Sequence, residues 1–127
     1  MPGWYKIDKE RRLVLTTASG VFTREDVLSC QKELAKDPDF DPTFSQLLDT
    51  THVTKPEVTA EDIQKFAEAD LFAPHARRAI IVKHDLCYGF ARMFELLRAD
   101  KGEQGISVFR DLEEGLEWVF PHGSQNS

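Results

Sequence analysis

The feature of this sequence that most constrains its fold is the short apolar run Ala79–Val82, which reads Ala-Ile-Ile-Val. The run does not alternate between apolar and polar residues. Runs of this length and composition are typical of a strand that is buried on both faces of a parallel sheet. Helices must then cover both faces, because neither face is left to water. The run therefore predicts an α/β domain with this strand at its centre.

Strand patterns and helix patterns alternate on both sides of this run. We expect the other four strands at residues 4–8, 13–18, 46–49 and 106–109. Helices are expected to begin at Thr23, Thr59, Asp85 and Asp111, and to end near residues 37, 73, 101 and 120. Right-handed crossovers between parallel strands place such helices on the sheet faces. The order ββαβαβαβα thus predicts a five-stranded mixed, mostly parallel sheet with four helices.

The boundaries of these elements follow from local signals. Gly20 is expected to end the second strand, and residues 50–58 are expected to form a polar loop. Two Thr-x-x-Asp stretches, beginning at Thr23 and Thr59, resemble capping boxes, in which the hydroxyl and the acid satisfy free amides at the helix start. A third capping box is expected at 111–114, and Asp85 is expected to cap its own helix.

Length and composition are those of one globular domain. The chain has 127 residues, of which 41% are hydrophobic and 30% charged, so it is long enough and apolar enough to bury a core. We expect a single domain at residues 1–120 and a flexible polar tail at residues 121–127.

Charge and cysteine usage exclude several classes of protein. The net charge of −6 disfavours nucleic acid as a partner, because phosphate backbones repel an acidic chain. The sequence has no apolar run long enough to span a membrane and no secretory signal at its start. Cys30 and Cys87 follow no metal-binding spacing and fit a reducing compartment. We therefore expect a cytoplasmic protein without a metal or cofactor.

Three stretches of the chain carry a family resemblance that covers roughly residues 4–120. They are Gly-Val-Phe-Thr-Arg-Glu-Asp at 20–26, Asp-Pro-Asp-Phe at 37–40, and Phe-Ala-Pro-His-Ala-Arg-Arg-Ala at 72–79 continued by Gly-Phe-Ala-Arg-Met-Phe-Glu at 89–95. With the element order, they resemble STAS domains, and more narrowly the small SpoIIAA-like bacterial proteins. The resemblance implies a regulatory or protein-interaction module rather than a particular catalytic activity.

The same resemblance names two candidate phosphoacceptors. Anti-sigma-factor antagonists of this family carry a phosphorylated Ser or Thr after the third strand, in an Asp-Ser-Ser-Gly-like run at a helix start. The corresponding stretch here is Asp-Thr-Thr-His at 49–52, which keeps the acid and two hydroxyls, at Thr50 and Thr51, but lacks the Gly. The next helix is also expected later, at Thr59.

Ligands in open α/β sheets bind beyond the carboxyl ends of the strands. Three groups of polar residues follow strands in this way and are expected to meet at one edge of the sheet. They are Asp49, Thr50, Thr51 and His52; Lys83, His84, Asp85 and Tyr88; and Arg110 and Asp111. Within this set, our candidate ligand-binding residues are Thr51, His52, His84, Asp85, Tyr88 and Arg110.

Residues at this edge have two possible chemical roles, and each role has a purely structural alternative. His84 and Asp85 would suit an acid/base pair, or a metal site with His52 as a third member, whereas the alternative is that Asp85 only caps a helix. Cys87 would lie in the first helical turn, where the positive helix end favours a reactive thiolate, whereas the alternative is an inert buried thiol.

The arginine and phenylalanine residues can also be interpreted either as ligand-binding or as structural. Arg77, Arg78, Arg92 and Arg98 would together suit an acidic ligand, but surface ion pairs are the more common use of arginine. The nine Phe residues are expected mainly in the core, although some of them would suit the lining of an apolar ligand pocket.

Three functional hypotheses follow. No phosphate-binding loop, nucleophile elbow or His-Glu-x-x-His motif is present, so the leading hypothesis is a non-enzymatic regulatory module that binds a protein partner or forms a homodimer. The contact is expected on the second and third helices near Thr51. The alternative is a binding protein for a small apolar or acidic ligand. The weaker alternative is an enzyme that uses His84 and Asp85, with Tyr88 nearby.

Overall fold

The computed structural model describes residues 4–121 and contains one five-stranded sheet with strands in the order β1-β2-β3-β4-β5. The strands are β1 (Tyr5–Asp8), β2 (Leu13–Thr23), β3 (Ser45–Glu57), β4 (Arg78–Ile81) and β5 (Ile106–Phe109). The helices are α1 (Arg24–Lys36), α2 (Ala60–Phe66), α3 (Asp85–Asp100) and α4 (Leu112–Val119). Only β1 is antiparallel to its neighbour, so the predicted mixed α/β sheet is confirmed. Of the expected tail, residues 122–127 lie outside the described range.

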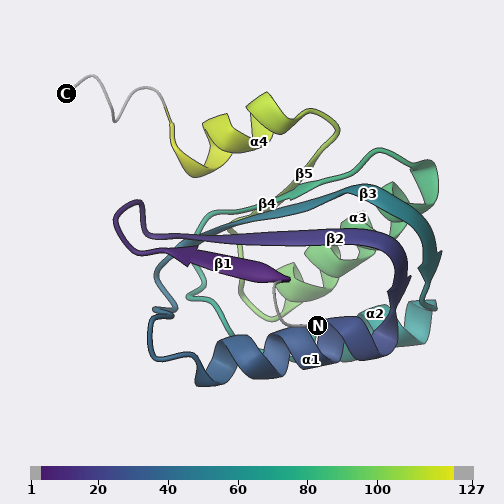
Figure 1. Ribbon diagram of the computed structural model, residues 1–127, viewed down its shortest axis with the longest axis horizontal. Helices are drawn as coiled ribbons and strands as arrows, with labels where there is room; N and C mark the ends of the chain where they lie inside the picture. The colour runs from purple at the N-terminus through teal and green to yellow at the C-terminus, as the bar shows by residue number, and fades with distance from the viewer. Residues whose placement is uncertain (1–3, 122–127) are drawn as a thin grey trace.

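The sheet separates two layers of helices. In Figure 1, α4 lies above the sheet, whereas α1, α2 and α3 lie on its other side. Because side chains alternate along a strand, each strand contributes to both layers. On β4, Ala79 and Ile81 pack toward Val119 of α4, whereas Ile80 and the following Val82 pack toward Ala91 of α3. All four residues of the 79–82 run are buried, as the run predicted.

The second and third strands are longer than the sequence indicated. Gly20 was expected to end β2, and residues 50–58 to form a loop, but β2 continues to Thr23 and pairs with β3 as far as Glu57. Gly20 has a φ of +66°, which glycine adopts without strain, and shifts in register lie beside it. A bulge bends a strand without ending it. The long strands therefore curve toward α1 and α2 in Figure 1.

All four helices begin where the sequence predicted, within one residue, but the predicted side-chain caps form in only two of them. Both Thr-x-x-Asp capping boxes are formed, at Thr23 and at Thr59. The other two expected caps were wrong. Asp111 occupies the N-cap position of α4 without a side-chain bond to the helix, and α3 is preceded by His84, so that Asp85 is its first residue rather than its cap.

Helix α2 is shorter than expected and ends at Phe66 instead of near residue 73. Side chains from other elements occupy the carbonyl groups at this end. Gln31 of α1 donates to the carbonyl of Phe66 at 3.1 Å, and Arg98 of α3 donates to that of Ala67 at 2.8 Å. These bonds satisfy carbonyls that a helix end leaves free.

Candidate functional site

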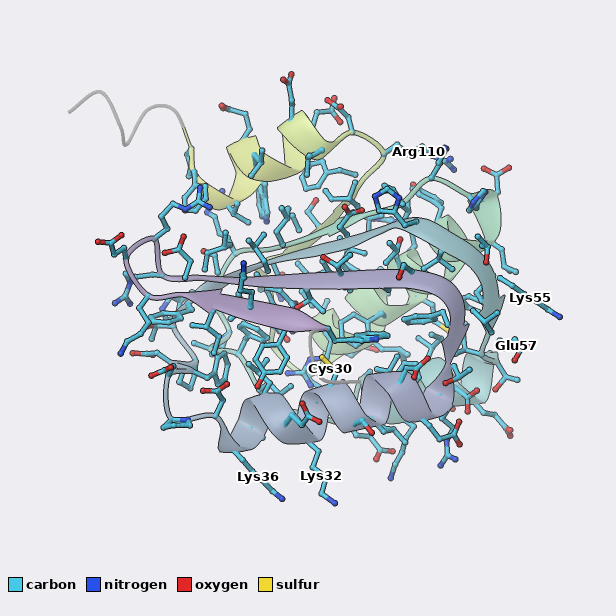
Figure 2. All side chains as sticks on the ribbon, viewed as in Figure 1. Cys30, Lys32, Lys36, Lys55, Glu57 and Arg110 are labelled. Atoms are coloured by element: carbon cyan, nitrogen blue, oxygen red, sulfur yellow. The ribbon has the colours of Figure 1, made fainter. Side chains whose placement is uncertain are left out.

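The layer between the sheet and helices α1, α2 and α3 contains a cavity of about 130 Å³ that is partly open to solvent. Its walls are mostly apolar. The sheet contributes Leu48 and Ile80, Val82 comes directly after β4, and α3 contributes Ala91. In Figure 2, Cys30 of α1 points toward the sheet, whereas Lys32 and Lys36 point away from it. The apolar face of α1 therefore forms one wall of the cavity, and its lysines face solvent.

Five of the nine Phe residues line this cavity, namely Phe22, Phe66, Phe72, Phe90 and Phe94. They come from β2, from α2, from the segment before β4 and from α3. The aromatic excess of the sequence thus surrounds a space as well as filling a core. These five residues do line a pocket, and the binding of a ligand there stays a prediction.

One end of the cavity is polar. Thr16, Gln46 and Arg78 lie on three adjacent strands, β2, β3 and β4, and all three line the cavity. The amide of Gln46 donates to Thr16 Oγ1 at 3.0 Å and accepts from Arg78 Nε at 3.1 Å. Each of the three residues is at most 7% exposed. Their positions alternate with apolar residues that pack on the opposite face.

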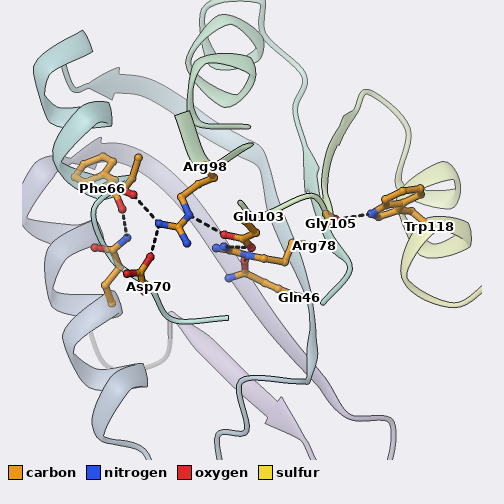
Figure 3. Close-up of polar contacts among 10 residues, drawn as sticks. Gln46, Phe66, Asp70, Arg78, Arg98, Glu103, Gly105 and Trp118 are labelled. Carbon is orange, nitrogen blue, oxygen red and sulfur yellow. Dashed lines mark hydrogen bonds and ion pairs between the residues drawn. The ribbon is translucent and has the colours of Figure 1, made fainter. Parts of the chain in front are cut away.

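A buried ionic network continues from Arg78 (Figure 3). Arg78 Nη1 donates to Glu103 Oε2 at 2.9 Å, and Arg98 Nε donates to Glu103 Oε1 at 2.7 Å. Arg98 also forms an ion pair with Asp70 at 2.9 Å. Glu103 is 2% exposed and Arg98 3%, whereas the Asp70 side chain is 81% exposed.

The network pairs two guanidinium groups with two carboxylates, of which only one is buried. Two buried guanidinium groups share the single buried carboxylate of Glu103, while Asp70 lies in solvent, where its charge is screened. Burial lowers the pKa of Arg78, and Glu103 only partly opposes this. Burial also lowers the pKa of Arg98, but its bonds to Glu103 and Asp70 outweigh burial, so the net shift is upward. Both arginines remain charged at neutral pH.

Aromatic rings hold the Arg78 guanidinium at the cavity end. Its Cζ atom lies 4.2 Å from the ring centroid of Phe72 and 5.6 Å from that of Phe94. Cations over aromatic faces at these distances are attracted to the ring electrons. Arg78 therefore belongs to the polar network and to the aromatic wall at once.

The surface interpretation of the arginines was right for two of them and wrong for two. Arg77 is exposed and lies 4.4 Å from the Trp118 ring centroid, and Arg92 forms a surface ion pair with Glu95 at 2.8 Å. Arg78 and Arg98 are instead buried beside the cavity. A signal was present in the sequence: Arg78 shares the strand face of Ile80 and Val82.

The predicted strand-end edge is assembled in part. Arg110 forms an ion pair with Asp85 at 2.8 Å, donates to the carbonyl of Lys83 at 3.3 Å, and lies 4.7 Å from the Tyr88 ring centroid. His84 is the exposed residue that precedes Asp85 at the start of α3. The Asp85 side chain is 96% exposed. These residues therefore contact one another on the protein surface and not in a buried site.

The residues expected after the third strand lie within β3 instead. Thr50 is buried, and its hydroxyl donates to the carbonyl of Ile81 at 2.7 Å. The Thr51 hydroxyl donates to Asp49 Oδ1 at 2.7 Å. His52 is exposed and pairs with Ser19. Phosphorylation at Thr50 or Thr51 stays a prediction, and modification of Thr50 would require its buried hydroxyl to leave Ile81.

The metal and thiolate interpretations lack support in the geometry. Within residues 4–121, no three His, Cys, Asp or Glu side chains form a group that would hold a metal ion, so His52 does not join His84 and Asp85. Burial raises the pKa of the Cys87 thiol, which is opposite to the shift that a reactive thiolate needs. Burial, with Glu33 nearby, raises the pKa of Cys30 to about 11.

Comparison with solved structures finds an uncharacterized protein from the DUF3478 family of Shewanella loihica PV-4, whose crystal structure has a SpoIIAA-like fold. The match covers 84% of this chain and 83% of that chain, with a TM-score of 0.55 and 22% sequence identity. This chain has a SpoIIAA-like fold.

The STAS-type architecture predicted from the sequence is thereby confirmed at the level of the fold. No protein-family model matches the chain, and neither does any curated protein. None of the helices within the described residues is long and apolar enough to cross a membrane. The features of this SpoIIAA-like domain that bear on its function are therefore its cavity and its surface.

Proposed function

We propose that this SpoIIAA-like domain binds a small, largely apolar molecule in the cavity between the sheet and helices α1, α2 and α3. The observation that carries the proposal is the cavity itself, with a volume of about 130 Å³ and five Phe residues in its wall. An engineered apolar cavity of roughly 150 Å³ is known to bind benzene. A ligand with one ring, or a short branched chain, matches this space.

The lining of the cavity supports a ligand. Because the cavity is partly open to solvent, its apolar walls are in contact with water, and a bound apolar molecule would remove that surface from water. Small ligands bind in concave, mostly apolar sites with a few placed polar groups. Thr16, Gln46 and Arg78 are such groups here.

Titration with toluene and with indole tests the proposal. Binding at the cavity is expected to shift the NMR signals of Ile80, Val82 and Ala91, and to raise the melting temperature as ligand concentration exceeds Kd. Shifts confined to the surface, or no stabilisation at saturating toluene and indole, would contradict the proposal. The matched control is Ala91→Leu, in which added carbons occupy the space and are expected to weaken binding.

A second candidate function is the regulatory, partner-binding role, which one surface observation favours. Leu86 and Leu96 of α3 are 56% and 57% exposed, and exposed apolar side chains are common at protein interfaces. Sedimentation velocity tests the homodimer form of this role. A dimer that is lost in a Leu86→Ser, Leu96→Ser variant would support it, whereas a monomer at high concentration would contradict self-association.

A further inference from the structure

We infer that the ligand is a small monocarboxylate, held by its carboxylate at Arg78 and by its apolar part among the Phe residues of the cavity. This inference rests on the proposed binding function. It adds what that function leaves open, namely the charge and the size of the ligand. The polar end of the cavity decides the charge, and the cavity volume decides the size.

Hydrogen-bonding capacity at Arg78 points to an acceptor. A guanidinium group donates from three nitrogens. Arg78 directs Nε to Gln46 and Nη1 to Glu103, and Nη2 is the remaining nitrogen. Thr16 lies one strand further away, on β2, and its hydroxyl accepts from the Gln46 amide. A carboxylate at this end of the cavity would accept from Nη2 of Arg78.

Electrostatics point to an anion. Arg78 and Arg98 place two positive charges in the interior against the one buried negative charge of Glu103. The other acid in the network, Asp70, lies at the surface and pairs with Arg98 only. Because the Asp70 side chain is 81% exposed, its charge is screened by water, and a negative charge at the Arg78 end would add to the one buried carboxylate that the two guanidinium groups share.

The same network limits the ligand to a single negative charge. Among residues 4–121, Arg78 is the only arginine or lysine that lines the cavity, and Glu103 lies 2.9 Å from its Nη1. A second negative charge on the ligand would approach Glu103 and would be surrounded by Phe side chains instead of donors. Phosphate groups and dicarboxylates are therefore disfavoured relative to a monocarboxylate.

Volume then limits the apolar part of the ligand. A cavity of about 130 Å³ is close to the roughly 150 Å³ that holds benzene in another protein. The ligand class is accordingly an aromatic monocarboxylate with a single ring, or a short-chain carboxylate of similar bulk. A long-chain fatty acid would exceed the space. Benzoate is the probe that meets both limits.

Matched probes test the inference in the full-length wild-type protein. Calorimetry at neutral pH should give benzoate an affinity at least tenfold higher than that of benzamide, which has the same shape without the charge. Equal or weaker binding of benzoate than of benzamide would overturn the carboxylate inference. If toluene still binds in that case, the proposed function stands. If toluene, indole, benzamide and benzoate all fail to bind, both proposals fall.

Arg78→Met tests the named residue. Methionine keeps most of the apolar bulk and removes the charge, so the preference for benzoate over benzamide should disappear while toluene still binds. Arg92→Met removes an exposed arginine from α3 and should leave the preference unchanged. An unchanged preference in a folded Arg78→Met variant would overturn the assignment. If that variant does not fold, the wild-type comparison of benzoate with benzamide decides.

Discussion

The two faces of the sheet are covered by helices in different ways, although the same strands supply both. On the α4 face, Gly115 lies so close to the sheet that an added Cβ would meet Ile81 Cδ1, with Ala79 and Leu47 just beyond. On the opposite face, three helices surround a cavity of about 130 Å³. One face is therefore filled to contact, and the other is hollow.

The difference lies in which residues alternate along the strands. Positions that face α4 carry aliphatic residues, among them Leu13, Leu47 and Ile81. The alternate positions on the same strands include Thr16, Gln46 and Arg78. Buried polar side chains at such positions need hydrogen-bond partners. They therefore form a hydrogen-bonded network on this face instead of a uniform apolar core. A sheet of this kind can keep one rigid face and use the other for binding.

The largest predicted effect concerns the network on the hollow face. Glu103→Gln removes the one buried negative charge that Arg78 and Arg98 share. Because this leaves the buried Arg78 guanidinium without a carboxylate partner and Arg98 with Asp70 alone, we expect a loss of about 3–5 kcal/mol in the free energy of unfolding. Urea denaturation monitored by circular dichroism measures the loss.

The control for this substitution is Glu68→Gln, at an exposed ion pair with Lys65. Exposed pairs contribute about 0–1 kcal/mol, so the control should change stability little. Similar losses in the two variants would mean that the Glu103 network contributes no more than a surface pair. The hollow face would then lack the rigid polar end on which the ligand inference depends.

A pair of glycine substitutions compares the packing of the two faces directly. In Gly115→Ala, the new Cβ meets Ile81, and an overpacking cost of about 1–3 kcal/mol exceeds the gain in helix propensity of about 1 kcal/mol. In Gly89→Ala, within α3, the new Cβ meets nothing within 4 Å, so only the gain remains. We expect opposite signs in chemical denaturation, and stabilisation by both substitutions would contradict tight packing under α4.

Filling the cavity is expected to change the free energy of unfolding less than the substitutions above. Ala91→Leu adds three carbons to a cavity wall, so stability should change by less than about 1 kcal/mol in either direction. The same change on the filled face, Ala79→Leu, should cost about 1–3 kcal/mol, because Ala79 is fully buried against α4. Thermal unfolding compares the two, and equal losses would argue that no usable space exists beside Ala91.

The order of strands and helices was predictable because local signals repeat and agree. The run 79–82, the capping boxes at Thr23 and Thr59 and the last strand, 106–109, were all recognised from spacing and residue type. The long pairing of β2 with β3 was not, because Gly20 is compatible with the end of a strand as well as with a bulge. Only pairing with another strand decides between these outcomes.

The site was predicted less well than the fold. The strand-end rule brought together Asp85, Tyr88 and Arg110, which do lie together, but on an exposed surface. The cavity depends on residues far apart in sequence, such as Arg78 and Glu103, whose pairing follows from tertiary packing alone. The alternation of side chains along β4 places Arg78 on the face opposite Ala79 and so indicates a buried position. Arginine is exposed in most proteins, however, and that preference favours the surface.

A further predicted effect is a pH dependence of stability at the wall of the hollow face. Burial raises the pKa of Cys30 from 9.0 to about 11 in the folded protein, with Glu33 adding to the rise. An acidic group whose pKa is raised by folding contributes full stability below its unfolded pKa and loses it as pH rises through the folded one. Stability should therefore fall between about pH 9 and pH 11.

Substitution by a residue that does not ionise isolates this contribution. In Cys30→Ser, the fall from pH 9 to pH 11 should be shallower than in the wild type, and the curves should run parallel below pH 8. Tyr5, whose pKa burial also raises, is common to both proteins and cancels in the difference. Urea denaturation at each pH gives the two curves. Parallel curves up to pH 11 would mean that water reaches Cys30 freely, and that this wall of the cavity is open to solvent and not part of an apolar site.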